Sequence, residues 1–154
     1  MKMIKTIALA TAASLTLALP AQADTPASVT LIRDGQRSDL SIDPATLGNR
    51  SSWNSYDGVL SVHFLASGPE GDWIVGLAVE NGQGRDGTMI PPAGVAHAVS
   101  DVQVAVQRAQ VQGNDLDLAG AVTDPATGLR IAFALTLPHI DFAPTPGPTP
   151  PPAK

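Results

Sequence analysis

Apolar and polar residues alternate along most of the chain, and this two-residue period predicts β-strands rather than helices. The clearest case is residues 129–137, where every odd position is apolar and Pro138, which has no N–H to donate, ends the run. A second alternating run precedes it at residues 116–122. The segment between them, 124–128, has turn composition, because proline fixes φ and glycine allows φ above zero. The sequence therefore predicts a β-hairpin over residues 116–137.

The strand before this hairpin changes phase part-way. Valines occupy the even positions from Val102 to Val106, whereas Ala109 and Val111 occupy odd positions. One extra residue in a strand moves all following side chains to the other face, so the change predicts a β-bulge near Arg108. A Gly-Asn-Asp turn then leads into the hairpin, which extends the prediction to an antiparallel meander of three strands.

Four more strands are expected upstream. Asp34-Gly35, a dipeptide suited to a type I′ turn, separates two of them, and a Ser-Gly-Pro-Glu-Gly turn separates the other two. These strands cover residues 29–33, 37–42, 60–66 and 73–79. The pattern is interrupted at 47–57 and at 81–92, and we expect both segments to cross between two sheets. Residues 93–99 suit a helical turn and a strand equally well.

These elements predict an all-β fold, either an antiparallel β-sandwich of about seven or eight strands or a small barrel. The two expected crossovers favour the sandwich. The chain contains no cysteine, so packing alone must hold this domain, which we place at residues 24–142.

Both ends of the chain differ from the domain. Residues 1–23 combine two lysines, an uncharged apolar run and a final Ala-Gln-Ala, the layout of a bacterial secretory signal peptide cleaved before Asp24. We therefore expect a periplasmic or secreted protein without a transmembrane anchor. Residues 143–154 are so rich in proline that we expect a disordered, extended tail.

Charge limits the possible partners. The formal net charge is −5 for the whole chain, and it becomes −7 when the two signal-peptide lysines, Lys2 and Lys5, are removed. Nucleic acids require a basic surface, so this balance argues against them as partners.

Catalytic and metal-binding signatures are weak. His63, His97 and His139 lie far apart on different predicted elements, which does not suit a zinc site. No Gly-x-Ser-x-Gly motif marks a nucleophile, and the glycine-rich segment 81–87 lacks the Lys-Ser/Thr pair of a phosphate-binding loop. We therefore predict neither catalytic residues, nor a metal, nor a cofactor.

The best candidate for a binding site is a polar segment that holds one of the two tryptophans and the only tyrosine. Arg50, Trp53, Asn54 and Tyr56 combine amphipathic aromatic rings with adaptable hydrogen-bonding groups, as recognition loops do. In the alternative, Trp53 plugs one end of the sandwich.

The resulting expectation is a non-enzymatic binding or envelope-interaction module whose partner is a protein or an envelope component. A second possibility is a barrel-like carrier of an apolar small molecule, with Gly76, Ala78, Gly120 and Ala121 leaving room for the ligand. A hydrolase with a dispersed catalytic triad is a third.

Overall fold

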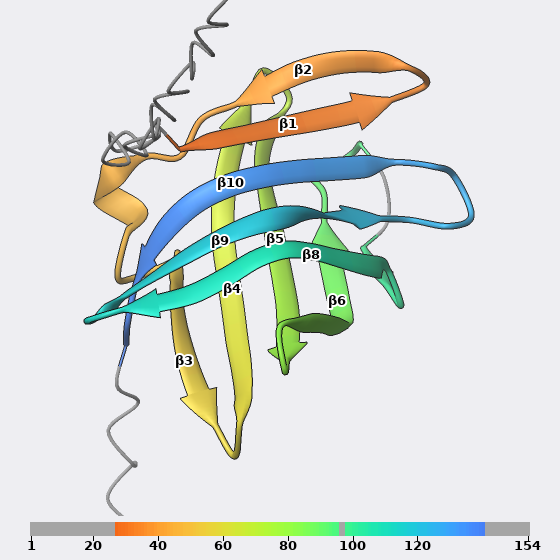
Figure 1. Cartoon of the computed structure of the whole chain (residues 1–154). Coiled ribbons are helices and arrows are strands. Elements are labelled where there is room, and N and C mark those ends of the chain that lie inside the picture. The colour runs from red at the N-terminus through yellow and green to blue at the C-terminus, as the bar shows by residue number, and fades with distance from the viewer. Residues whose placement is uncertain (1–26, 96–97, 141–154) are drawn as a thin grey trace, which may run out of the picture.

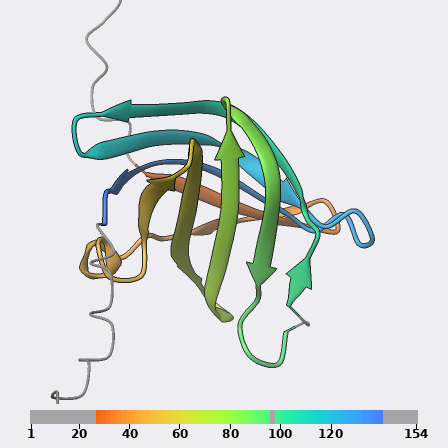
Figure 2. The same cartoon turned by 90° about the horizontal axis from the view of Figure 1, so that it is seen from below.

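The computed structural model describes residues 27–95 and 98–140. Over these residues the chain forms two antiparallel five-stranded sheets, which pack face to face as a sandwich. Figure 1 shows the strands of one sheet running across those of the other, and Figure 2 shows the same two layers from below. We call them sheet A, with the order β2-β1-β10-β9-β8, and sheet B, with the order β3-β4-β5-β6-β7.

The strands of sheet A are β1 (Ser28–Arg33), β2 (Gln36–Leu40), β8 (Gln103–Gln112), β9 (Asp115–Thr123) and β10 (Arg130–Pro138). Those of sheet B are β3 (Ser52–Tyr56), β4 (Val59–Gly68), β5 (Gly71–Glu80), β6 (Gln83–Ile90) and β7 (Val99–Ser100). A 3-10 helix, η1 (Pro44–Thr46), lies between β2 and β3. The sandwich is confirmed, whereas the expected strand number was too low.

Both expected crossover segments were wrong, because each contains a strand of sheet B. Residues 47–57 contain β3 and residues 81–92 contain β6, while the chain changes sheet at 41–51, between β2 and β3, and at 101–102, between β7 and β8. The alternation is hidden in β3 because Trp53 is its single large apolar residue. In β6 it is hidden by glycines and by a register shift opposite Ala78 and Val79.

The glycines of β6 allow β8 of sheet A to approach β6 of sheet B closely. A Cβ atom on Gly84 would lie 2.6 Å from the carbonyl oxygen of Val104 in β8, and one on Gly87 would lie 2.8 Å from the Val104 side chain. These distances are shorter than real Cβ contacts, so only glycine fits here. β6 therefore meets β8 through backbone proximity rather than through large apolar side chains.

Two local predictions are confirmed by the backbone. Asp34 and Gly35 have φ values of 51° and 76°, as a type I′ turn between β1 and β2 requires. The register of β8 against β9 shifts between Val106 and Arg108, where the change of phase placed a bulge.

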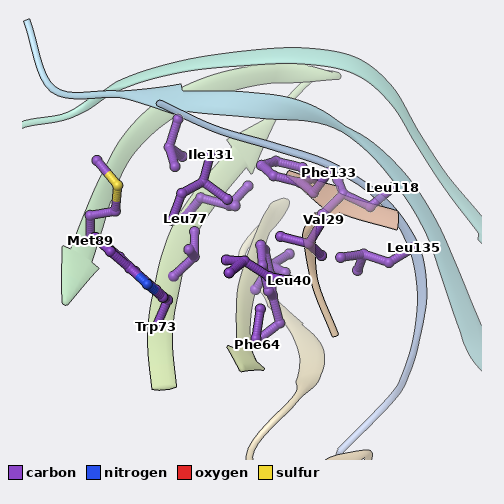
Figure 3. Close-up of a cluster of buried hydrophobic side chains, with 14 of the residues drawn as sticks. Val29, Leu40, Phe64, Trp73, Leu77, Met89, Leu118, Ile131, Phe133 and Leu135 are labelled. Atoms are coloured by element: carbon purple, nitrogen blue, oxygen red, sulfur yellow. The ribbon is translucent and has the colours of Figure 1, made fainter. Parts of the chain in front are cut away.

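The core lies between the two sheets and contains the predicted inward-facing residues. Figure 3 shows side chains of both sheets meeting there, among them Phe133 from β10 and Phe64 from β4. The rings of these two residues are 5.3 Å apart at an angle of 64°, an edge-to-face arrangement. Phe133 is the register partner of Gly120 in β9, where a Cβ atom would collide with the Ala105 carbonyl oxygen of β8.

The turn between β9 and β10 is organised by a buried carboxylate. One oxygen of Asp124 accepts a hydrogen bond from the Ala126 backbone N–H at 2.9 Å, and the other accepts one from the Thr127 hydroxyl at 2.6 Å. The hydroxyl of Thr127 in turn accepts from the Leu129 N–H at 3.3 Å. The Thr127 hydrogen bond first, and the Ala126 bond second, lower the pKa of Asp124 below its ordinary value.

This lowered pKa predicts a specific dependence of stability on pH. Because the folded protein holds the carboxylate ionised, the stabilisation is present above the unfolded pKa of about 4 and is lost as pH falls through the lower folded value. We expect wild type to be more stable than Asp124→Asn at pH 7, and the difference to shrink in acid. Urea melts of both proteins at several pH values between 7 and 2.5 measure this difference in unfolding free energy. A difference that does not change with pH would contradict a lowered pKa of Asp124 in the folded state.

The predicted signal peptide and the proline-rich tail lie outside the described residues. Within residues 27–95 and 98–140, no helix is long and apolar enough to cross a bilayer.

Candidate functional site

A groove opens where the β1–β2 hairpin passes over the turn between β4 and β5. Its volume is about 330 Å³, and its apolar surface comes mainly from Leu31, Leu40, Pro69 and Trp73. Leu31 and Leu40 lie on the inner face of sheet A, and Trp73 lies on the inner face of sheet B. The groove is therefore an extension of the core that reaches solvent at one end of the sandwich.

Arg33 and Glu70 form a clasp across this opening. The Arg33 side chain donates two hydrogen bonds to Glu70, with Nη1–Oε1 and Nη2–Oε2 both 3.0 Å, so the pair is bidentate. The guanidinium carbon of Arg33 also lies 5.6 Å from the ring centroid of Trp73, within range of a cation–π interaction. Arg33 ends β1 and Glu70 lies in the β4–β5 turn, so the clasp joins the two sheets.

Polar side chains surround the rest of the groove. Asp34 belongs to the type I′ turn, and Gln36 and Ser38 lie on exposed β2. A Cβ atom on Gly68, at the end of β4, would lie only 2.6 Å from the Cδ2 atom of Leu40, so a larger residue here would require the Leu40 side chain to shift. The arrangement combines an apolar surface with a charged rim, which is typical of recognition sites.

Trp53, the central residue of the sequence-predicted binding site, is buried. Its side chain is 6% exposed and belongs to the core. Its ring lies 4.6 Å from that of His139, edge-on, and its carbonyl oxygen accepts a hydrogen bond from the Ile140 N–H at 2.9 Å. Trp53 thus holds β3 against the end of β10. This agrees with the alternative interpretation of the sequence, in which Trp53 plugs one end of the sandwich.

The other three residues of that predicted site do not surround one cavity. Tyr56 is 82% exposed at the tip of the β3–β4 hairpin, Asn54 is half-buried, and Arg50 is exposed before β3 begins. Arg50 lies in a turn, where its backbone N–H donates to the Thr46 carbonyl, and Tyr56 lies at the far end of β3, which at about 3.3 Å per residue is roughly 13 Å long. A binding role for these residues stays a prediction, and it would require a broad partner surface.

A serine–histidine pair also lies on sheet B. Ser52 Oγ and His63 Nε2 are 3.3 Å apart, because Ser52 and His63 are register partners in β3 and β4. Ser52 is 1% exposed, so a substrate would have no access to this hydroxyl. The arrangement fits a hydrogen bond within the sheet better than a catalytic nucleophile.

The residues that could hold a metal are dispersed. No group of three His, Cys, Asp or Glu side chains with the geometry for a metal ion occurs in the part of the chain that the structure describes. His63 lies on β4, His139 follows β10, and His97 lies outside the described residues.

The residues that were expected to leave room for a carried ligand are not brought together. Gly76 and Ala78 pair with His63 and Ser61, on the outer face of sheet B, and Ala121 lies on the outer face of sheet A. Gly120 is buried in β9, and the backbone of Ala105 in β8 already occupies the place that a Cβ atom would take.

Sequence reasoning missed the groove, although one signal was present. Arg33 continues the inward phase of Val29 and Leu31, and a charged residue at an inward position is unusual unless it has a partner. The partner, Glu70, is 37 residues away, so only the packing of the two sheets shows it.

No protein-family model matches this chain, and comparison with curated proteins and with solved structures gives no significant match.

Proposed function

We propose that this chain is an exported, non-enzymatic binding module and that the groove between the β1–β2 hairpin and the β4–β5 turn is its recognition site. The observation that carries the proposal is the groove itself, in which an apolar surface continuous with the core is bordered by charged and amide side chains. Apolar contact supplies affinity in such sites, and the polar rim supplies specificity. A protein or another component of the cell envelope is the expected partner.

Export is part of the proposal and rests on residues 1–23. Their charged start, apolar run and small residues before Asp24 fit cleavage by a signal peptidase. Peptide mapping of protein from the periplasmic fraction should find Asp24 at the N-terminus, whereas an intact Met1 would contradict export by this route.

A small-molecule carrier is the second candidate, and the groove volume favours it. At about 330 Å³, the groove is at the lower end of the range, roughly 300–1,000 Å³, of small-molecule sites. Mass spectrometry of the natively purified protein would distinguish the candidates, since a carrier retains a small molecule and a binding module retains a macromolecular partner.

Filling the groove tests whether it is the recognition site. Ser38 lies on β2 and lines the groove, so Ser38→Phe should occupy it and remove any copurifying partner or ligand. Ser28→Phe is the matched control, because Ser28 is exposed on β1 and does not line the groove. Equal retention by both variants would show that recognition occurs elsewhere.

A further inference from the structure

We propose that the groove recognises an arginine side chain of a polypeptide partner, whose guanidinium takes the place that Arg33 occupies between Trp73 and Glu70. This inference rests on the proposed function, because it names the chemistry that the groove selects.

Trp73 and Glu70 already form a guanidinium-binding site in this structure. Both Glu70 oxygens accept hydrogen bonds from Arg33 at 3.0 Å, and the guanidinium carbon lies 5.6 Å from the indole centroid of Trp73. A planar guanidinium suits this combination because it can pair with a carboxylate in its plane and contact an aromatic ring with its face. The chain itself therefore shows which chemical group the site accepts.

The clasp is accessible to a competing cation. The side chains of Arg33 and Glu70 are 36% and 44% exposed, so solvent reaches both partners. Ion pairs at this exposure contribute little to stability, because water screens them and two long side chains must be ordered. Arg33 is the last residue of β1, so its side chain can move into solvent when another guanidinium takes its place.

The surroundings of the clasp suit the rest of an arginine residue. Leu31 and Leu40 provide an apolar surface for the aliphatic stem, and Asp34 adds a second carboxylate at the rim. β2 is an edge strand of sheet A, so its outer backbone groups can pair with an extended peptide. The edge of β2, which pairs with no further strand of the sheet in the part of the chain that the structure describes, is the reason to infer a polypeptide rather than a free guanidinium compound.

Long-range charge also favours a basic partner. The formal charge of −7 for the chain without residues 1–23 attracts cations and increases their rate of encounter. The electrostatic field of the negatively charged protein increases the encounter rate of any cation, whereas the clasp determines which cationic group binds.

A titration with matched probes tests the inference. We would titrate the protein with Nα-acetyl-arginine N-methylamide and, separately, with its citrulline analogue, a neutral isostere of the same shape. In a Trp53→Phe background Trp73 is the only tryptophan, so its fluorescence reports on the site, and amide NMR shifts locate the binding. The arginine probe should bind at least about 10-fold more tightly than the citrulline probe, the scale of one charge-assisted hydrogen bond.

Removing the resident side chain should strengthen binding, which a purely structural clasp does not predict. If the clasp is closed roughly 80% of the time, Arg33→Ala should bind the arginine probe about fivefold more tightly than wild type. Adding Glu70→Gln to Arg33→Ala should remove this gain, because the carboxylate is lost. Circular dichroism melts confirm that each variant is folded, and the wild-type titration remains decisive if one is not.

Three outcomes would overturn the inference: equal binding of the citrulline probe, no shifts at groove residues, or no gain in Arg33→Ala. The proposed function is tested separately by Ser38→Phe. A partner that is lost on filling the groove, together with equal binding of the two probes, would support the recognition site and reject arginine as its ligand.

Discussion

Phe133→Ala is expected to destabilise the fold by about 3–5 kcal/mol, the loss typical of removing a large aromatic side chain from a core. Phe133 is 4% exposed in the middle of β10 and contacts Phe64 of the opposite sheet edge-to-face. Alanine would remove that contact and leave a cavity between the two sheets. Urea unfolding followed by circular dichroism measures the change.

Thr136→Ala is the matched control for Phe133→Ala. Thr136 lies three residues further along β10 and is exposed on the outer face of sheet A, so its loss should change stability by no more than about 0.5 kcal/mol. Similar losses for both variants would mean that the outer face of sheet A is also covered, for example by another molecule.

Trp53→Ala should have an effect of similar size, about 3–5 kcal/mol, because the buried side chain belongs to the core and packs against His139, directly after β10. Trp53→Phe should be much milder. The indole Nε1 of Trp53 is buried without a hydrogen-bond partner among the described residues, and phenylalanine removes that unpaired donor while keeping an aromatic ring. Thermal melts of the two variants should therefore differ by several degrees.

Tyr56→Ala provides the control from the same strand. Tyr56 is 82% exposed, so this change should leave the melt almost unchanged, and any loss of partner binding would then report on recognition alone. An almost unchanged melt for Trp53→Ala, together with ready quenching of Trp53 by acrylamide, would instead place Trp53 at the surface and support the sequence-predicted recognition loop.

The accuracy of the sequence-based predictions differed between the two sheets. In β10, and in β9 except at Gly120, large apolar residues recur at every second position, so strand limits, facing and turn were all predicted. β3 and β6 were missed because their packing depends on a single tryptophan and on glycines that make room for β8. Periodicity detects residues that fill a core, and it cannot detect residues that allow another strand to come close.

Sequence-based prediction of the binding site met the same limit. A cluster of polar and aromatic residues close together in sequence suggested one site, yet alternation along β3 buries Trp53 and exposes Tyr56. The groove joins Arg33 and Trp73 to Glu70, which lies in a different hairpin from Arg33 and is distant in sequence. Neither hairpin contains enough information to predict the other as its neighbour.

The sequence by itself therefore determined the all-β class, the hairpin turns and the bulge in β8, because steric limits on φ and the two-residue side-chain period act within a strand and its immediate neighbour. Only the tertiary structure decided which hairpins share a sheet, that Trp53 lies inside, and that Arg33 meets Glu70 above Trp73. These features depend on how two sheets cross and pack, and that arrangement is set by side chains that are far apart along the chain.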